Sequence, residues 1–225
     1  MVAGNKHEKL NKTRLRHLWK TQVRPVVMVV TVLCTFRSAI ADWNDVPTGS
    51  MKPTILEGDR IIVNKLAYDL TVPFTTCNFL QWGTPQHGDI IILYSPADGK
   101  RLVKRVIGTP GDRVAMRNNR LWINVHSAEY LPHTDNPVVT ERFEQASHAI
   151  KWIAQRPRRS SFGPLTIGKD EYLVLGDNRD NSMDSRWFGL VKRHRIVGRA
   201  TQLAISVDHT RMYRPRRERF GQSLD

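Results

Sequence analysis

The chain has 225 residues, enough for one domain of ordinary size or for one domain that carries an insertion. Hydrophobic residues make up 40% and charged residues 25%, a composition that excludes a disordered or low-complexity protein. Lys and Arg outnumber Asp and Glu by 35 to 21, and the formal net charge of +14 indicates an anionic partner, either nucleic acid or membrane head groups.

The N-terminal segment is first basic and then apolar. Residues 1–24 contain seven lysines and arginines against one acid, Glu8. Residues 25–36 carry no charge and read PVVMVVTVLCTF. A membrane-spanning helix needs about 20 mostly apolar residues, so a span must extend to Ala41 and include Arg37, whose charge can reach the interface.

Two interpretations of this segment stay open on these residues. As an anchor, residues 25–41 cross the membrane once, and the basic tail of residues 1–24 stays in the cytoplasm. As a cleavable signal peptide, the same residues precede a cut after Ala39-Ile40-Ala41. Both interpretations place the rest of the chain outside the cytoplasm. Both also assign the strongest basic cluster to membrane insertion, which disfavours nucleic acid as the partner.

The residues after position 42 follow a strand pattern. Asn118-Asn119 stands between two strand-like runs and suits a tight hairpin, because Asn tolerates positive φ. Only residues 140–153 show a weak helical pattern. We predict a mainly antiparallel β domain whose strands are the short runs rich in Val, Ile and Leu at residues 60–66, 89–94, 102–107, 113–116, 121–125, 171–175 and 196–207.

Residues 115–164 are more polar than their surroundings and indicate an insertion between two halves of the core. The three histidines of this stretch, His126, His133 and His148, lack the spacing of a zinc site, so we predict structural or surface roles for them and no metal. Two further basic clusters, at residues 156–159 and 211–219, suit solvated loops and anion binding equally well.

Three segments carry candidate catalytic residues. Ser50 follows Gly49 in a Pro-rich stretch that cannot form a regular helix, and such a segment can present its hydroxyl to a substrate. Lys104 lies among apolar residues of a predicted strand, and a lysine buried enough to be neutral can activate a serine. Residues 175–189 gather many hydrogen-bonding groups and predict a network that supports a site. No Ser-His-Asp arrangement competes, since His87 has no evident partner in the sequence.

At these segments the chain resembles the bacterial type I signal peptidases. Four motifs appear in the order of that family: VPTGSMKPT at 46–54, GDRIIVNKLAY at 58–68, KRVIGTPGD at 104–112 and GDNRDNSMDSRWFG at 176–189. Together with the intervening strands they cover most of residues 46–207. The resemblance implies a mainly β catalytic core with a small inserted domain, no cofactor, and removal of signal peptides after Ala-x-Ala sites of exported preproteins.

The resemblance also implies a role for individual residues. Ser50 is the expected nucleophile and Lys104 the expected general base, while the Ser50 N–H and the hydroxyl at position 48 form the oxyanion hole. Position 48 is Thr here and not the Ser of well-known members; Thr keeps the hydroxyl and adds a stiff methyl group. Ser182 is expected to orient Lys104. The expected supporting residues are Asp184, Arg186 and Arg105, and the expected substrate pocket comprises Val46, Pro47, Met51, Ile55 and Val103.

Because members of this family are retained in the membrane, the resemblance favours the anchor. The expected organisation is a basic cytoplasmic tail (1–24), a transmembrane anchor (25–41), a catalytic core in two parts (42–114 and 165–209), the insertion (115–164) and a basic C-terminal tail (210–225). We expect a single-pass protein of the bacterial inner membrane with its catalytic domain on the extracytoplasmic side, where preproteins and membrane lipid are its partners.

Three rival functions remain. Two are Ser/Lys peptidases, namely a pilus-protein maturation peptidase and a LexA-like self-cleaving repressor, although no DNA-binding segment precedes the core. The third is a secreted basic binding protein without catalysis, which predicts that Ser50→Ala has no effect on function.

Overall fold

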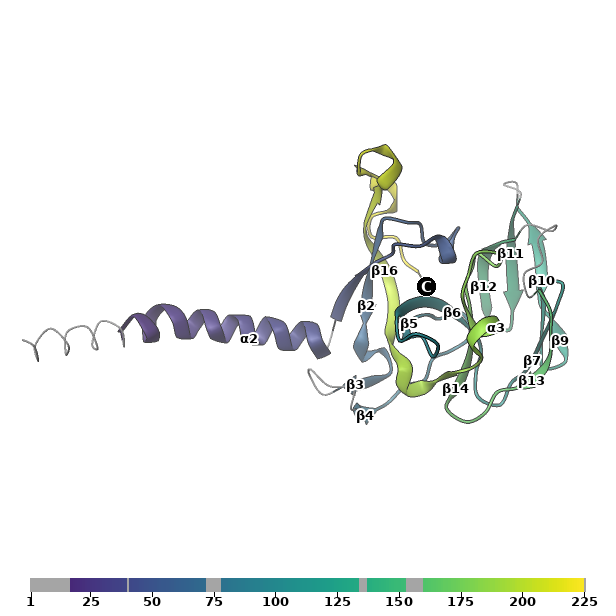
Figure 1. The fold of residues 1–225 in the computed structure, drawn as a ribbon, viewed down its shortest axis with the longest axis horizontal. Helices are drawn as coiled ribbons and strands as arrows, with labels where there is room; N and C mark the ends of the chain where they lie inside the picture. The colour runs from purple at the N-terminus through teal and green to yellow at the C-terminus, as the bar shows by residue number, and fades with distance from the viewer. Residues whose placement is uncertain (1–16, 40, 72–77, 134–136, 153–159, 225) are drawn as a thin grey trace, which may run out of the picture.

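A computed structural model describes residues 17–39, 41–71, 78–133, 137–152 and 160–224 of the chain. A single helix extends away from a body made almost entirely of antiparallel strands (Figure 1). The mainly β class predicted from the sequence is confirmed, and each of the seven predicted runs contains a strand. The Asn118-Asn119 hairpin is confirmed as well, because both residues have positive φ and join two paired strands.

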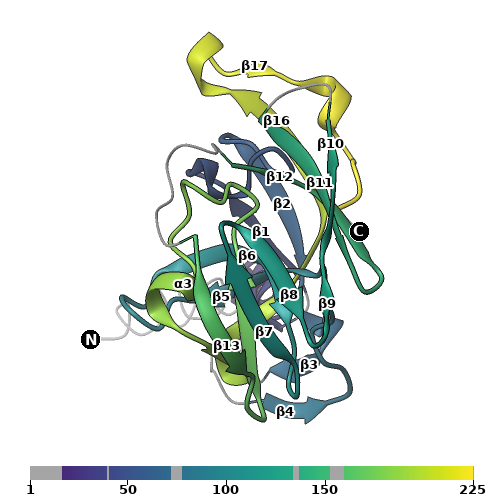
Figure 2. The same ribbon diagram turned by 90° about the vertical axis from the view of Figure 1, so that its right-hand side faces the viewer.

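The largest sheet of the described residues has eight strands and follows the order β1-β2-β16-β5-β6-β14-β15, with β17 paired to β16. Every pair in it is antiparallel. It is strongly curved and brings the N-terminal motifs next to the C-terminal ones (Figures 1 and 2). Its strands are β1 (Ala41–Asp45), β2 (Asp59–Asn64), β5 (Ile90–Tyr94), β6 (Arg101–Gly108), β14 (Glu171–Leu175), β15 (Val191–Lys192), β16 (Ile196–Asp208) and β17 (Arg214–Pro215).

Three smaller sheets complete the described part of the chain. The first is four-stranded, in the order β13-β7-β8-β9, and comprises β7 (Arg113–Arg117), β8 (Arg120–Ile123), β9 (His126–Ser127) and β13 (Phe162–Thr166). The second is three-stranded and comprises β10 (Glu129–Pro132), β11 (Val138–Phe143) and β12 (Ala146–Lys151). The third is the hairpin of β3 (Asp69–Thr71) and β4 (Asn78–Gln81). The four-stranded and three-stranded sheets lie together on one side of the large sheet (Figure 1).

The weak helical pattern at residues 140–153 does not correspond to a helix. Strands β11 and β12 occupy this range and pair from Val138–Lys151 to Phe143–Ala146. Glu144 turns the chain between them with a positive φ of 47°. Buried residues alternate in both strands and include the polar Glu141 and His148, so burial has the period of two of a strand.

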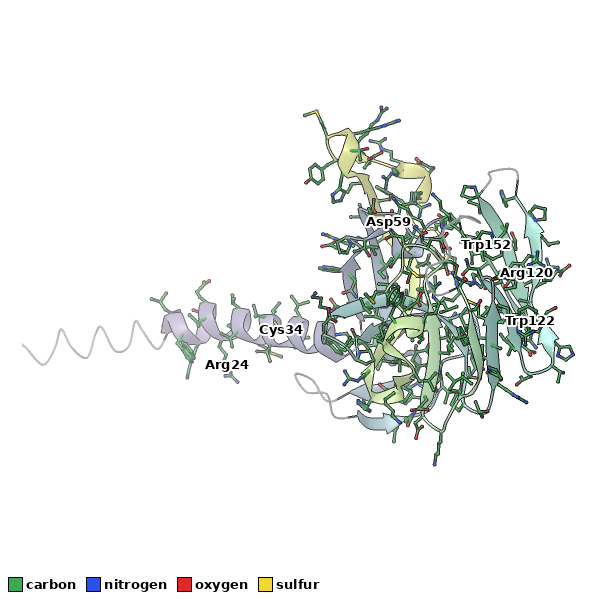
Figure 3. All side chains as sticks on the ribbon, turned by 45° about the vertical axis from the view of Figure 1, so that its right-hand side comes forward. Arg24, Cys34, Asp59, Arg120, Trp122 and Trp152 are labelled. Carbon is green, nitrogen blue, oxygen red and sulfur yellow. The ribbon has the colours of Figure 1, made fainter. Side chains whose placement is uncertain are left out.

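The N-terminal helix α2 (Arg24–Ala39) has 16 residues and continues a π-helical turn at Trp19–Val23. Its apolar side chains from Val26 to Leu33 are exposed, as is Cys34, and they project from an element that stands clear of the body (Figure 3). No helix among the described residues is long and apolar enough to cross a membrane.

Two clusters of buried side chains pack on opposite faces of the large sheet. One contains Met51, Ile55, Ile61, Ile90 and Leu203, and therefore underlies the segment that carries Ser50. The other contains Tyr68, Ile91, Val106, Tyr172 and Val174. A third cluster joins β6 and β14 to the four-stranded and three-stranded sheets.

The C-terminal segment is largely exposed but contacts the core at two points. Leu224 is buried in the cluster that holds Met51 and Ile55. Arg219 donates to the Asp59 carboxylate at 2.7 Å and to the Thr54 carbonyl at 3.0 Å. These contacts tie the end of the chain to the segment that follows Ser50. The other predicted basic cluster, at residues 156–159, lies outside the described residues.

Candidate active site

Ser50 lies in a single turn of 3-10 helix, Gly49–Met51, that follows the end of β1. The turn sits on the apolar cluster below it, because Met51 and Ile55 are fully buried while Ser50 itself is partly exposed. Thr48 precedes the turn in an extended conformation, is exposed, and does not cap the turn with its side chain. The segment therefore presents two hydroxyl groups, those of Thr48 and Ser50, above a packed apolar cluster.

Lys104 lies in the middle of β6 and only 2% of its surface is exposed. Its Nζ is 2.8 Å from Ser50 Oγ and donates to the Val103 carbonyl at 3.0 Å. Burial lowers the pKa of Lys104 from 10.5 to about 8; the carboxylates of Asp184 and Asp177 oppose this shift and Arg186 assists it. A substantial fraction of Lys104 is therefore neutral near pH 8, as proton abstraction from Ser50 requires.

Arg105 does not lower the pKa of Lys104, although it is adjacent in the chain. Successive side chains of a strand point to opposite faces of the sheet, so the Arg105 side chain points away from that of Lys104. It forms two hydrogen bonds with the Asp177 carboxylate, at 2.9 Å and 2.8 Å. Both partners are almost fully buried, and the pair joins β6 to the segment that begins at Gly176.

Asp184 and Arg186 form a second buried pair, with hydrogen bonds of 2.8 Å from both Nε and an Nη of the guanidinium. Asp184 also accepts from the Gly176 backbone N–H at 3.0 Å and from the Arg186 N–H at 3.3 Å. Burial alone would raise the pKa of Asp184, but the hydrogen bonds and charge of Arg186 outweigh it and hold the pKa below its usual value.

Ser182 is buried beside the dyad, but within the described residues its hydroxyl makes no hydrogen bond to Lys104. Gly176 lies in contact with Ser182: a Cβ added at Gly176 would be 2.2 Å from Ser182 Oγ and 2.5 Å from the Ser50 carbonyl oxygen. Among the described residues, Ser182 contacts Gly176 and also lowers the pKa of Asp184, and it makes no orienting hydrogen bond to Lys104.

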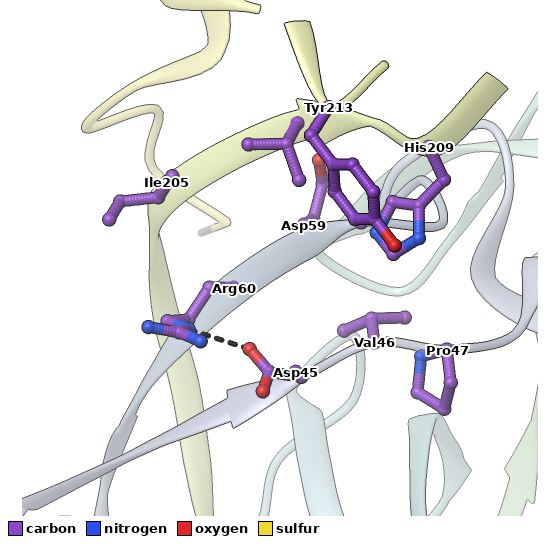
Figure 4. A pocket seen from close by; sticks show the side chains of 10 residues that line it. Asp45, Val46, Pro47, Asp59, Arg60, Ile205, His209 and Tyr213 are labelled. Atoms are coloured by element: carbon purple, nitrogen blue, oxygen red, sulfur yellow. Dashed lines mark hydrogen bonds and ion pairs between the residues drawn. The ribbon is translucent and has the colours of Figure 1, made fainter. Parts of the chain in front are cut away.

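The five predicted pocket residues differ in exposure. Val46, Met51 and Ile55 are buried in one cluster, Val103 packs against that cluster, and Pro47 is exposed. A cavity of about 410 Å³ opens beside Val46 and Pro47, between the ends of β1, β2 and β16. Its wall includes the Arg60–Asp45 ion pair and the rings of His209 and Tyr213 (Figure 4). Ser50 and Lys104 do not line this cavity.

Two residues of the polar stretch at 175–189 had no individual role predicted from the sequence, although both bond to backbone carbonyls at or next to the Ser50 segment. Asn178 donates from its backbone N–H to the Ser50 carbonyl at 3.0 Å and from its side chain to the Gly49 carbonyl at 2.9 Å. Arg179 is fully buried and donates to the Gly176 carbonyl at 3.2 Å. The many polar residues at 175–189 indicated a hydrogen-bond network, but the sequence does not show which of them bond to the backbone.

No histidine among the described residues forms a hydrogen bond or ion pair with Ser50. His87 Nε2 lies 2.7 Å from Asp112, which also accepts from the Thr109 backbone and hydroxyl. His148 is buried beside Glu141, whereas His126 and His133 are exposed. None of these contacts reaches Ser50, and the basic side chain that lies beside its hydroxyl is Lys104.

A serine hydroxyl beside a buried lysine on an antiparallel sheet is the arrangement of a serine hydrolase that uses lysine in place of histidine. The family model described as "Signal peptidase, peptidase S26" matches residues 19–204. The chain belongs to this family of serine endopeptidases and, within it, to the bacterial type I signal peptidases.

The curated relatives agree with this assignment. The chain is 37% identical over 212 residues to a signal peptidase I of Pseudomonas aeruginosa, covering 86% of this chain and 74% of the relative. It is 36% identical to that of Pseudomonas fluorescens, with the same coverage. It is 34% identical over 176 residues to signal peptidase I P of Bacillus subtilis subsp. natto, covering 78% and 82% of the two chains.

Proposed function

We propose that this protein removes signal peptides from exported preproteins, with Ser50 as nucleophile and Lys104 as general base. The observation that carries the proposal is the 2.8 Å separation of Lys104 Nζ from Ser50 Oγ, with the lysine buried and its pKa lowered to about 8. A nucleophile and base within hydrogen-bond reach, together with a pKa near the working pH, are what general base catalysis requires.

The reaction is an acyl transfer in two steps. Neutral Lys104 takes the proton of Ser50 Oγ as this oxygen attacks the carbonyl carbon of the −1 residue. The tetrahedral intermediate then collapses: the peptide bond breaks, and the ammonium of Lys104 returns its proton to the leaving amine of the mature protein. Water, deprotonated in turn by Lys104, attacks the ester carbon; the ester bond breaks, the ammonium of Lys104 returns the proton to Ser50 Oγ, and the signal peptide leaves with a free carboxylate.

The oxyanion of both intermediates is stabilised by the Ser50 backbone N–H and the Thr48 hydroxyl. The extended backbone and exposure of Thr48 support this role, because its hydroxyl is not engaged in capping the turn. Arg105, Asp184 and Arg186 hold the strand and loop around the dyad through their buried ion pairs. Ser182 supports the site through its packing against Gly176 and its interaction with Asp184, the carboxylate that acts on the pKa of Lys104.

Specificity for Ala at −1 and −3 follows from a small apolar surface beside the dyad, formed by Val46, Pro47, Met51, Ile55 and Val103. Met51 and Ile55 are fully buried and Val103 packs against their cluster, so these side chains form the apolar base of that surface.

The N-terminal segment anchors the protein in the bacterial inner membrane, with the catalytic part on the extracytoplasmic side and the basic tail in the cytoplasm. The charge-free run at residues 25–36 and the basic residues before it support this topology. The catalytic core has two parts, separated by an insertion at residues 115–164. Extraction of membranes at alkaline pH tests the anchor: the full-length protein stays in the pellet, whereas a soluble form that begins at Asp42 contradicts it.

The function is tested by incubating detergent-solubilised protein with a purified preprotein and determining the cut position by mass spectrometry. Wild type cuts once, after an Ala-x-Ala sequence, and Ser50→Ala does not cut. Cleavage by Ser50→Ala at the wild-type rate, or cleavage at unrelated positions, refutes the proposal.

A further inference from the structure

Residues 177–179 lie between the nucleophile and the three-stranded sheet of the insertion. On one side, the backbone N–H of Lys151 at the end of β12 donates to the Asp177 carbonyl. The backbone N–H of Arg179 donates to the Lys151 carbonyl, and both bonds are 2.8 Å long. On the other side, Asn178 donates to the carbonyls of Ser50 and Gly49. The backbone of the catalytic turn is therefore bonded to a segment that is itself bonded to β12.

A buried ion pair fixes this segment to the same sheet. Arg179 donates through both of its terminal nitrogens to the carboxylate of Glu141 on β11, one of them at 2.9 Å. Tyr130 on β10 donates to the same carboxylate at 2.7 Å, and His148 on β12 lies 3.3 Å from it. Glu141 and Arg179 are both fully buried.

The ionisation of Glu141 depends on these partners. Burial alone would raise its pKa, but the Arg179 charge and the hydrogen bonds of His148 and Arg179 outweigh burial and hold the pKa at about 2. Glu141 is consequently charged at every pH at which the protein works, and it neutralises Arg179 throughout.

Arg179 also connects to the residues around Lys104. Its carbonyl accepts from the Arg186 guanidinium at 2.6 Å, and its Nε donates to the Gly176 carbonyl. Arg186 in turn holds Asp184, whose carboxylate accepts from the Gly176 N–H. Gly176 approaches the Ser50 carbonyl so closely that no Cβ fits between them. Arg179 is thus linked through Gly176 to Ser50, and through Arg186 and Asp184 to two of the charges that act on the pKa of Lys104.

We propose that Glu141 is a positioning residue for catalysis, and that the sheet of β10, β11 and β12 serves the active site by holding Arg179 and, through it, the loop at 176–179 against Ser50. This inference rests on the proposed Ser50/Lys104 chemistry. It gives the inserted sheet a role at the catalytic centre without contact between that sheet and the reacting atoms.

The test compares Glu141→Gln with wild type in full-length protein, using a preprotein peptide as substrate. The glutamine keeps the shape of Glu141 and removes the charge that fixes Arg179. Because small displacements of reacting groups cost about 10²-fold in rate, we expect kcat to fall roughly 10- to 100-fold while KM stays within about twofold.

The matched control is Asp69→Asn, which breaks another buried pair, Asp69–Arg193. Asp69 is on β3, on the opposite side of the molecule from β11 and β12 (Figure 1). This variant should lose thermal stability much as Glu141→Gln does but keep the wild-type kcat. Equal losses of kcat in both variants would mean that Glu141 acts only through global stability, and would overturn the proposal.

A second variant covers the case in which Glu141→Gln does not fold because Arg179 is left buried and unpaired. Glu141→Leu combined with Arg179→Met replaces the pair by apolar groups, and such exchanges are often tolerated in protein interiors. The folded double variant should show the same fall in kcat, and wild-type kcat in it would overturn the proposal. Ser50→Ala is assayed in parallel: if it retains activity, the proposed function has failed, and that outcome is separate from failure of the role of Glu141.

Discussion

Lys104 can accept a proton only while its amine is uncharged, so the rate of cleavage should follow the ionisation of this side chain. With a pKa of about 8, roughly 10% of Lys104 is neutral at pH 7. An exposed lysine with a pKa of about 10.4 would be only about 0.04% neutral at that pH. Burial in β6 therefore increases the reactive fraction roughly 200-fold.

The assay is cleavage of a preprotein peptide in detergent, from about pH 6 to about pH 10. We expect kcat/KM to rise nearly tenfold per pH unit well below pH 8 and to level off above it, because the neutral amine is then the dominant form. Lys104→Arg should be inactive across this range, since arginine does not deprotonate in a protein. A rate independent of pH, or a Lys104→Arg variant that cleaves near the wild-type rate, would refute the assignment of Lys104 as the base.

The same burial has a cost in stability. The unfolded chain binds the lysine proton more tightly than the folded chain does. Burial of Lys104 therefore lowers the free energy of unfolding by its full amount below pH 8, and this loss disappears as pH rises from about 8 to about 10.4. A difference of about 2.4 pKa units corresponds to about 3 kcal/mol. Lys104→Met should therefore be inactive yet unfold at a higher temperature than wild type at pH 7, with little difference near pH 10.5. A destabilised Lys104→Met at pH 7 would show that the charged lysine is well accommodated.

Three further predictions follow from the contacts of the site. Thr48→Ala should lower kcat about 10²- to 10³-fold because it removes one oxyanion donor, while Thr48→Ser should be nearly as active as wild type. Equal rates for all three proteins would show that the Thr48 hydroxyl does not stabilise the oxyanion. Gly176→Ala should reduce both activity and thermal stability, because its Cβ would collide with the Ser50 carbonyl, and a fully active variant would contradict the close approach. Asp177→Asn should lower the free energy of unfolding by about 3–5 kcal/mol, measured by denaturant titration, because it leaves Arg105 charged, buried and unpaired.

Much of the fold and of the dyad could be predicted from the sequence because their signals are local. Runs such as DIIILY and LVKRVI are rich in β-branched residues and bounded by turns, so each specifies a strand by itself. Ser50 and Lys104 were recognised from the residues immediately around them. The structure brings the two side chains to 2.8 Å although 54 positions separate them.

Other features depend on pairing between distant residues, and no local pattern reports them. Residues 140–153 form strands because they pair with β10 and with each other across the turn at Glu144, and these pairings are seen only in the folded chain. The pKa of Lys104 is set by burial, with charge from Asp184 and Arg186 and none from the adjacent Arg105, because strand geometry directs neighbouring side chains to opposite faces.

The sequence by itself determined the β class, the family and the identity of the two candidate catalytic residues. Only the tertiary structure decided that Glu141 holds Arg179, 38 positions away, and that Leu224 lies beneath Ser50 with Met51. The physical reason is that a buried charge and a buried apolar side chain take their partners from whatever the folded chain places beside them, and that choice is made by packing in three dimensions.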